Sequence, residues 1–396
     1  MIKIAILGFG VVGSGTAEVL TENKKVIEER LGCEYEIKYI LDLRDFPDSP
    51  FGNLVVHDFN VILNDPEVTV VAEMMGGSHP AYDFSLACLK AGKNVVTSNK
   101  EVVSTFGVEL CSVAAENGVR YLFEASVGGG IPVIRPMIND LASNKINKIC
   151  GILNGTTNYI LTKMRDNGES FADALSAAQK LGYAEANPSA DVDGIDAARK
   201  IVILAALASG KLIDPKSINT EGITAISLLD TKIAEELGCS IKLIGQAHIK
   251  DNGLCALVSP CFVPKSNPLS RIDDVFNGIL IDANMVGEVM FYGPGAGKLP
   301  TASAVVADII DIIANREAEV KTINWTAADS ADLCDFADFE CKRVIISSAP
   351  IKLDVKVTQH VALDGAYAYA TEPISEAAVA AINETNPEIT SVFRML

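Results

Sequence analysis

The sequence predicts an α/β protein built on a doubly wound parallel sheet, followed by a second, mixed α+β domain and a small C-terminal subdomain. Two observations support this fold class. Short apolar runs alternate with helical patterns up to about residue 130, and beyond "GGGIPVIRP" the helices become longer and are mixed with strands. Strands separated by helices of this length imply right-handed crossovers between parallel strands.

The first domain is expected to span residues 1–130. Its strands are predicted at "IKIAIL", "EIKYIL", "VTVVAEM", "NVVTSN" and "RYLFEAS". Helices are predicted from about Ser14 to Arg30 and near residues 80–91. Strands that are buried on both faces of a sheet have nearly continuous apolar runs, so these segments fit a parallel sheet covered by helices.

The second domain is expected to span residues 131–299. Its predicted helices cover about 157–166, 171–181 and 194–209, and its strands include "KINKICGILN" and "GCSIKLIGQAHI". A further helix within 300–318 contains "TASAVVADIIDIIA", which is apolar on nearly every side. A helix of that kind must be buried, and we expect it to pack back on the first domain.

The last part of the chain, residues 325–396, is expected to form the small C-terminal subdomain. Strands are predicted at "KRVIISS", "KLDVKV" and "AYAYAT", and a helix is predicted at "ISEAAVAAINE".

The composition narrows the range of functions. The chain has 396 residues and a formal net charge of −18, which repels phosphate backbones and anionic lipids. Nucleic acid and membrane surfaces are therefore not expected as partners, whereas a small molecule is. The nine cysteines include no CxxC pair, and the N-terminus enters a strand at once without a secretory signal. These features predict a cytoplasmic protein with reduced thiols.

A glycine-rich turn follows the first strand. Gly8, Gly10 and Gly13 form a GxGxxG pattern that encloses Val11 and Val12 and opens a helical segment. In the dinucleotide-binding fold these glycines allow a tight turn, close approach of the backbone to a pyrophosphate, and close packing of helix on strand. The alternative is a plain glycine-rich turn, but the position between strand and helix favours a Rossmann-type site for NAD or NADP.

The end of the second strand leaves the choice of cofactor open. In "ILDLRDF", Asp42 is placed to bind the ribose hydroxyls of NAD, whereas Arg44 is placed to bind the 2′-phosphate of NADP. The alternative for each residue is a solvated loop charge, and for Arg44 this alternative is as plausible as cofactor binding.

Two more segments are placed near a cofactor. Lys100 follows the strand that ends at "NVVTSN", and ligands of open α/β sheets bind beyond the carboxyl ends of strands. The cluster "GPGAG", which contains Gly297, precedes the buried helix and brings bare backbone to this region. An ordinary surface lysine and an ordinary loop are the simpler explanations.

A second group of polar residues precedes the apolar run "IVILAALASG". Asp196 and Lys200 are four residues apart and share one face of the predicted helix. Burying both charges is costly unless they are paired or used, so we interpret them as a functional pair rather than as a surface ion pair. Glu185, Asp191 and Asp193 in the preceding loop are candidates for holding a substrate ammonium group.

Residues 178–200, "AQKLGYAEANPSADVDGIDAARK", resemble the signature segment of the homoserine dehydrogenase family. The segments "GFGVVGSGT", "VVTSNKEVV", "FEASVGGGIP", "GILNGTTNYIL" and "GPGAGKLPTASAV" also occur in the family's order. The resemblance implies NAD(P)-dependent interconversion of L-homoserine and L-aspartate 4-semialdehyde, in the branch that leads to threonine and methionine. It further implies that the second domain carries catalysis and dimerisation, in a homodimer or homotetramer.

The resemblance also assigns roles to residues. It implies that Lys200 is the acid/base group and that Lys100 assists it and borders the nicotinamide. Glu185 and Asp196 would hold the substrate near the hydroxyl of Thr156, and Gly297 would lie against the cofactor. A structural sodium ion is implied in the loop "EASVGGGI", through Glu124, Val127, Gly129 and Ile131.

Some features depart from the resemblance or leave alternatives. The C-terminal segment lacks the "DRPG" turn of the family's ligand-sensing module, so it is interpreted as a candidate degenerate regulatory module. An alternative enzyme is aspartate-semialdehyde dehydrogenase, which needs a cysteine beside a histidine. An alternative of another class is a redox-sensing protein that binds NAD(P) without turnover.

Overall fold

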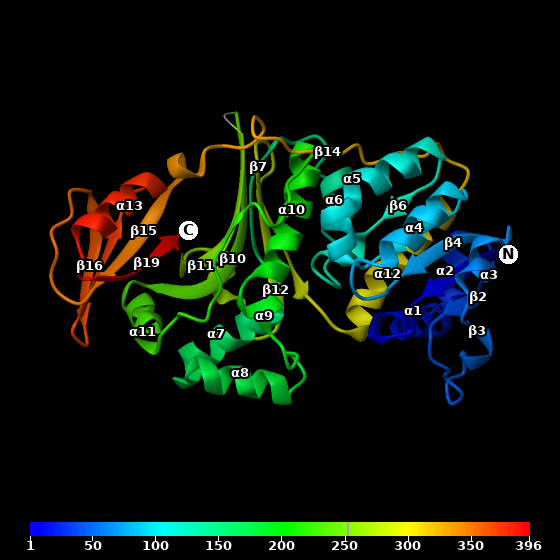
Figure 1. Ribbon diagram of the computed structural model, residues 1–396, viewed down its shortest axis with the longest axis horizontal. Helices are drawn as coiled ribbons and strands as arrows, with labels where there is room; N and C mark the ends of the chain where they lie inside the picture. The colour runs from blue at the N-terminus through cyan, green and yellow to red at the C-terminus, as the bar shows by residue number, and fades with distance from the viewer. Residues whose placement is uncertain (252) are drawn as a thin grey trace. The chain divides into compact units, whose positions relative to one another are not determined.

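The computed structural model describes residues 1–251 and 253–396. The chain divides into two compact units, each made of several segments (Figure 1). Unit 1 comprises Met1–Ser143, Ala206–Asp214 and Gly293–Ala327, and unit 2 comprises Asn144–Ala205, Pro215–Tyr292 and Ala328–Leu396. No helix within the described residues is both long and apolar enough to cross a bilayer.

Unit 1 contains a parallel six-stranded sheet in the order β3-β2-β1-β4-β5-β6. The strands are β1 (Ile2–Leu7), β2 (Tyr35–Leu41), β3 (Val55–Val56), β4 (Val68–Glu73), β5 (Asn94–Thr97) and β6 (Tyr121–Leu122). The order reverses direction at β1, as in a doubly wound sheet. The predicted fold class is thereby confirmed for this part of the chain.

Helices cover the sheet of unit 1. They are α1 (Val11–Glu22), α2 (Lys24–Leu31), α3 (Phe59–Leu63), α4 (Ala81–Lys90), α5 (Lys100–Glu116) and α6 (Ile134–Asn139). The later helix α12 (Lys298–Ala314) packs against α1 and β4 (Figure 1). Its apolar side chains, such as Val305 and Ile309, share one core with Ile4 and Ile6 of β1.

Two predictions within unit 1 are wrong in detail. The single helix expected from Ser14 to Arg30 is two helices, because the backbone leaves the helical conformation at Asn23, which ends α1 and precedes α2. Only Tyr121–Leu122 of "RYLFEAS" is a strand. The following residues, Glu124–Ser126, form a 3₁₀ turn because the chain bends there rather than pairing further with β5.

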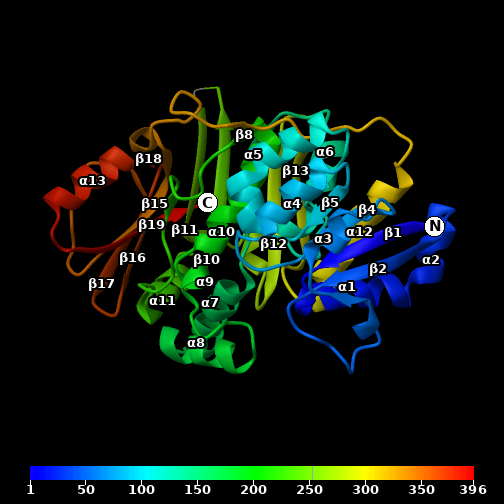
Figure 2. The same cartoon turned by 45° about the vertical axis from the view of Figure 1, so that its right-hand side comes forward.

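Unit 2 is organised around an eleven-stranded sheet, whose main path runs β13-β12-β7-β10-β11-β19-β15-β17-β16 (Figure 2). The path comprises β7 (Ile146–Ile152), β10 (Cys239–Lys250), β11 (Gly253–Pro264), β12 (Phe276–Ala283), β13 (Gly287–Pro294), β15 (Glu340–Ser347), β16 (Val357–Leu363), β17 (Ala366–Thr371) and β19 (Ile389–Met395). The strands β9 (Asn219–Thr220) and β18 (Ile374–Ser375) pair at its sides. The C-terminal strands thus continue the sheet through the parallel pair β11–β19.

The helices of unit 2 pack around this sheet. They are α7 (Gly155–Asn167), α8 (Phe171–Lys180), α9 (Ser189–Val192), α10 (Ile195–Ser209), α11 (Leu228–Glu236) and α13 (Glu376–Thr385). In α10 the residues from Ile201 to Leu204 are completely buried. Gly245 of β10 faces Ile201, and a side chain at position 245 would come within 3.2 Å of it. The helix therefore packs directly on the central strand.

The C-terminal segment differs from its prediction in one strand. "KLDVKV" was expected to be a strand, but residues 351–356 are irregular and β16 begins only at Val357. The alternating pattern of 351–356 favours an extended chain, but a strand also needs a neighbour to complete its hydrogen bonds. That neighbour, β17, pairs with Val357–Leu363 instead.

Candidate functional site

The glycine-rich turn between β1 and α1 has the geometry that a dinucleotide requires. Gly8 has a φ of +88°, and a Cβ at Gly13 would lie 1.9 Å from the main-chain oxygen of Gly8. A side chain at either position would therefore displace the turn. Gly10 is the N-cap of α1 and has open space beside its Cα. The positive end of the helix dipole is thus available to a phosphate group.

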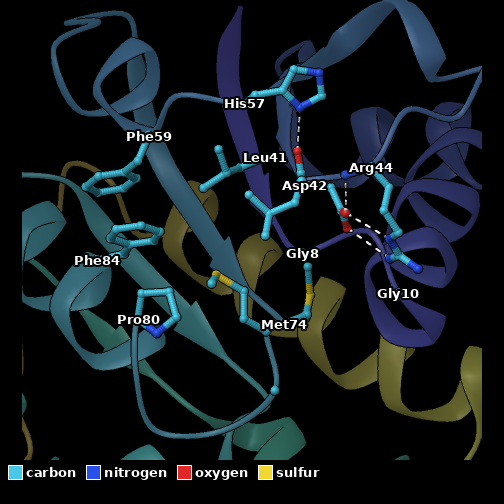
Figure 3. A pocket seen from close by; sticks show the side chains of 13 residues that line it. Gly8, Gly10, Leu41, Asp42, Arg44, His57, Phe59, Met74, Pro80 and Phe84 are labelled. Atoms are coloured by element: carbon cyan, nitrogen blue, oxygen red, sulfur yellow. Dashed lines mark hydrogen bonds and ion pairs between the residues drawn. The ribbon is translucent and has the colours of Figure 1, made fainter.

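A cavity of about 490 Å³ lies beside this turn, at the carboxyl ends of β1, β2 and β4 (Figure 3). It is lined by Gly8, Gly10, Leu41, Asp42, Leu43, Arg44, His57, Phe59, Met74, Met75, Gly76, Pro80 and Phe84. The rings of Phe59 and Phe84 are stacked with their centroids 4.0 Å apart. Figure 3 shows this stack and the pair formed by Asp42 and Arg44 on different sides of the cavity. The aromatic side suits a flat base, and the charged side suits a ribose or phosphate.

Asp42 and Arg44 form a two-bond ion pair at the end of β2. The Nε of Arg44 donates to Oδ1 of Asp42 at 3.0 Å, and Nη2 donates to Oδ2 at 3.1 Å. The backbone N–H groups of Phe9 and Arg44 donate to the same carboxylate. These hydrogen bonds, led by those from the Arg44 side chain, lower the pKa of Asp42 to about 2. The carboxylate is therefore ionised at neutral pH.

His57 lies beside this pair and was not predicted. Its Nδ1 is 2.7 Å from the main-chain oxygen of Asp42, and its Nε2 is 3.1 Å from a carboxylate oxygen of Asp45. Because both partners only accept hydrogen bonds, both contacts are made only by the protonated ring. The bond to Asp42 raises the pKa of His57. When the ring is protonated, His57 and Asp45 form an ion pair beside the cavity.

Lys100 is the first residue of α5 and follows β5, as the sequence placed it. Asn99 caps this helix through Val102 N–H, and its amide donates to the main-chain oxygens of Met75 and Gly77. The Asn99 side chain therefore joins the start of α5 to the loop after β4, part of which lines the cavity.

Glu73 at the end of β4 belongs to the same network and was also not predicted. Its carboxyl group accepts hydrogen bonds from the Thr97 hydroxyl and the Met75 N–H, both at 2.6 Å. The side chain is completely buried, and burial raises the pKa of Glu73 to about 7. The buried Glu73 carboxyl group therefore holds the loop after β4 in place through its bond to the Met75 N–H.

Gly297 is the N-cap of α12, with a φ of +122°. The segment before it approaches the glycines that follow β6, because a Cβ at Gly129 would lie 2.5 Å from the main-chain oxygen of Gly295. The glycines of "GPGAG" and "VGGGI" thus allow close backbone contact within unit 1.

The loop that contains the four predicted cation ligands is buried. The Glu124 carboxylate accepts hydrogen bonds from the N–H groups of Val133, Ile134 and Arg135. Within residues 1–251 and 253–396, no donor reaches the main-chain oxygens of Val127, Gly129 or Ile131, although all three residues are buried. The described residues contain no cluster of three or more His, Cys, Asp or Glu side chains suited to a metal ion.

In unit 2, Lys200 and Asp196 form a buried ion pair on α10. The Nζ of Lys200 is 2.7 Å from Oδ2 of Asp196 and donates to the main-chain oxygen of Leu153 at 2.7 Å. Lys200 is 7% exposed and Asp196 is 5% exposed. The pair is therefore desolvated, as the sequence suggested, and it is not a surface ion pair.

Asn154 connects this pair to α7 and was missed by the sequence analysis. Its side-chain oxygen caps α7 through Thr157 N–H at 2.9 Å. Its amide nitrogen donates to Asp196 at 2.9 Å and to Asp191 at 2.7 Å. An asparagine directly before a helix is a typical N-cap, so the start of α7 could have been recognised. Its contacts to two aspartates that are more distant in the sequence could not have been recognised from such a pattern.

The other predicted substrate residues are placed differently. Thr156 is buried near the start of α7 and donates to the main-chain oxygen of Tyr183 at 2.6 Å. Glu185, two residues beyond Tyr183, has an exposed side chain. The structure of unit 2 therefore brings Lys200 and Asp196 into direct contact, places Asp191 next to them, and leaves Glu185 at the surface.

Comparison with known proteins identifies the family of this chain. Residues 132–310 match the family model of homoserine dehydrogenase, and residues 8–124 match that of the homoserine dehydrogenase NAD binding domain. A homoserine dehydrogenase from Synechocystis is 43% identical over 320 residues, which are 79% of this chain and 73% of that protein. The chain belongs to the homoserine dehydrogenase family.

Solved structures agree with this assignment. A homoserine dehydrogenase from Thiobacillus denitrificans has a TM-score of 0.91 at 32% identity, over 100% of this chain and 98% of that one. A hyperthermophilic archaeal homoserine dehydrogenase in complex with NADPH has a TM-score of 0.69 at 27% identity, over 81% of this chain and 99% of that one. These comparisons confirm the family resemblance, the fold class and a nicotinamide cofactor, either NAD or NADP, for an oxidoreductase of this family. They give no support to a sensor without turnover.

Proposed function

We propose that the protein catalyses the NAD(P)-dependent interconversion of L-homoserine and L-aspartate 4-semialdehyde, as a step of threonine and methionine biosynthesis. The observation that carries this proposal is the buried pair of Lys200 and Asp196, 2.7 Å apart on α10. A buried lysine beside a carboxylate is a proton donor and acceptor of a kind that oxidation of an alcohol needs.

Lys200 is proposed as the group that moves the proton. In the direction of reduction, its ammonium group protonates the oxygen that becomes the hydroxyl of homoserine. In the other direction, the neutral amine accepts the same proton. Asp196 holds the ammonium in position, and Asn154 in turn holds Asp196 at 2.9 Å. Lys100 at the start of α5 is proposed to assist.

The substrate is proposed to bind through unit 2. Asp196 and Glu185 are the proposed acceptors for its ammonium group, and the Thr156 hydroxyl lies at the start of α7. Because Glu185 is exposed, its side chain is accessible to a ligand. A carboxylate matches an ammonium group in charge and in hydrogen bonding.

The cofactor is proposed to bind through unit 1. The bound nicotinamide supplies or accepts the hydride. The N–H groups at the start of α1, from Val11 and Val12, are proposed to face the pyrophosphate, with Gly8, Gly10 and Gly13 allowing its approach. Lys100 and Gly297 are proposed to lie near the nicotinamide, and Asp42 and Arg44 near the adenosine ribose.

A structural sodium ion is proposed in the loop from Glu124 to Ile131. Support comes from the main-chain oxygens of Val127, Gly129 and Ile131, which are buried and receive no hydrogen bond within the described residues. Buried oxygens without donors are costly, and oxygen ligands suit a hard cation. The thermal midpoint should be higher in sodium chloride than in choline chloride of equal ionic strength. Equal midpoints would contradict the ion.

The protein is proposed to act in the cytoplasm as a homodimer or homotetramer, with a small amino acid as its substrate and without nucleic acid or membrane partners. Sedimentation velocity at several concentrations measures the assembly, and a monomer at micromolar concentration would contradict it.

The C-terminal part, residues 325–396, is proposed as a degenerate regulatory module. Added threonine should then leave the activity unchanged.

One assay tests the proposed reaction. The purified protein with L-homoserine and NAD or NADP should produce reduced nicotinamide, detected by its absorbance. Aspartate-semialdehyde dehydrogenase activity would instead need phosphate and the semialdehyde to reduce NADP. A protein that binds the cofactor but gives no homoserine-dependent absorbance change would disprove the proposal.

A further inference from the structure

Arg394 of β19 is a buried arginine that contacts carboxylates from two distant parts of unit 2. It is 5% exposed, and β19 lies between β11 and β15 in the sheet (Figure 2). Its Nε and Nη2 donate to Oε1 of Glu376 at 3.0 and 2.8 Å. Its Nη1 donates to Oε1 of Glu221 at 2.6 Å. The guanidinium therefore joins the start of α13 to the segment that contains Glu221.

The charges around Arg394 explain why Glu221 is held firmly. Glu376 also pairs with Arg343, which is 2% exposed. Two buried guanidinium groups thus share Glu376, and Glu221 supplies the second negative charge. Because a buried charge that loses its partner is costly, the bond between Arg394 and Glu221 is more than a surface ion pair, although Glu221 itself is 44% exposed.

The Glu221 segment, residues 221–223, lies against the turn after α9. The N–H of Ile223 donates to the main-chain oxygen of Val192 at 2.8 Å. A Cβ at Gly222 would lie 2.3 Å from that oxygen and 2.7 Å from Cα of Asp193. Backbone therefore packs directly on backbone here, so a shift of the Glu221 segment would be passed to the turn.

The turn after α9 is connected to the proposed catalytic pair. Asp191 of α9 accepts a hydrogen bond from Nδ2 of Asn154 at 2.7 Å, and the same nitrogen donates to Asp196 at 2.9 Å. Asp196 is 2.7 Å from Nζ of Lys200. Glu185, a proposed substrate acceptor, precedes α9 in the same stretch of chain. Movement of the turn would therefore disturb the proposed acceptors for the substrate ammonium group.

We propose that Arg394 acts through Glu221 to position the turn after α9, so that the C-terminal strand β19 supports substrate binding. Arg394 is a positioning residue, because it works through the Glu221 segment. This inference rests on the proposed function, because it concerns the substrate side of the same site.

Steady-state kinetics at saturating cofactor separate positioning from chemistry. Arg394→Gln should raise KM for L-homoserine by about 2- to 30-fold, the range for residues that act on a site through others. The kcat and the cofactor affinity should change by less than about twofold, because neither the proton donor nor the cofactor site is altered. Glu221→Gln should raise KM by a smaller factor, because it keeps an acceptor for Arg394. This milder variant preserves the test if Arg394→Gln does not fold.

Two further variants identify the route. The double variant Arg394→Gln with Glu221→Gln should raise KM no more than Arg394→Gln alone, because both changes interrupt the same contact. Arg343→Gln is the matched control, since this buried arginine lies on the neighbouring strand β15 and pairs with Glu376. Its KM should stay near that of the parent. The inference is overturned if the two single effects multiply in the double variant, or if Arg343→Gln raises KM equally.

Hydrogen–deuterium exchange measures the turn without turnover. In full-length Arg394→Gln, exchange should increase in peptides from residues 188–196 and 219–226 and stay at the parent level in unit 1. No increase in 188–196, or an even increase over all of unit 2, would overturn the inference and leave the proposed function intact. If the unmodified protein did not oxidise homoserine, the proposed function would fail, while the exchange data would still decide whether Arg394 holds the turn.

Discussion

The candidate sites contain two ion pairs of opposite character, one in each unit. In unit 1, Asp42 and Arg44 lie at the end of a strand, and the side chain of Arg44 is 64% exposed. In unit 2, Asp196 and Lys200 lie one turn apart on a helix, and both side chains are less than 10% exposed. The two pairs have similar lengths, 3.0 and 2.7 Å, and both carboxylates are largely buried, but the two cations differ greatly in exposure.

This difference in burial determines what each pair can do. An exposed pair contributes little to stability, so its arginine can interact with a ligand at little cost to the fold. A buried pair has lost its hydration, so each charge depends on the other. The exposed pair therefore suits selection of a ligand, and the buried pair suits chemistry.

The largest expected effect concerns the buried lysine. Lys200→Ala should lower kcat by about 10²- to 10⁴-fold, the usual contribution of an acid/base group, and should leave cofactor affinity unchanged. Steady-state kinetics and a cofactor titration measure the two quantities. Lys232→Ala, at an exposed lysine of α11, is the control. Near-native turnover of Lys200→Ala would show that another group moves the proton.

The next largest effect concerns its partner. Asp196→Asn removes the carboxylate charge 2.7 Å from a buried ammonium, which should destabilise the fold by about 3–5 kcal/mol. Urea unfolding followed by circular dichroism measures the change. The double variant Lys200→Met with Asp196→Leu should recover much of that stability, because the buried charges are then absent. A loss below about 1 kcal/mol for Asp196→Asn would mean that the pair is effectively solvated.

A smaller effect concerns pH and the buried Glu73 of unit 1. Its pKa is raised from 4.5 to about 7 in the folded protein, so between these values the folded state holds a proton that the unfolded state has lost. The contribution of Glu73 therefore makes the protein less stable as the pH rises through this window. Glu73→Gln should reduce this decline. The control is Glu116→Gln, at an exposed glutamate of α5, and an identical pH profile for Glu73→Gln and the parent would contradict the prediction.

The smallest effect concerns the exposed pair. Arg44→Ala should change the free energy of unfolding by less than about 1 kcal/mol. The same urea experiment used for Asp196→Asn gives a direct comparison of the two pairs. If Arg44→Ala destabilised the protein as much as Asp196→Asn, the contrast between the pairs would be lost.

Local patterns predicted much of unit 1. The apolar runs located β1, β2, β4 and β5, and the glycine spacing located the turn before α1. The helix α5, from Lys100 to Glu116, was not predicted, although Asn99 is a recognisable N-cap. Strand β3 has only two residues, which is too short for a periodic signal.

The networks around the candidate sites were harder to predict. Asn154 contacts Asp196 across 42 positions, and Glu124 contacts Asp308 across 184. Likewise, β19 lies parallel to β11 at the point where Cys261 pairs with Arg394. No periodicity within a short window encodes such pairings, because they depend on which elements the whole fold brings together.

The sequence by itself determined the family, the strand–helix alternation of unit 1, the glycine turn, and the placement of Asp196 and Lys200 on one helical face. These follow from local spacing and from short motifs. Only the tertiary structure decided that Asn154 bonds to Asp196, and that Asp42 accepts hydrogen bonds from both Arg44 and Phe9. The reason is that desolvation and the filling of lone pairs depend on neighbours in space, and most of these neighbours are distant in the chain.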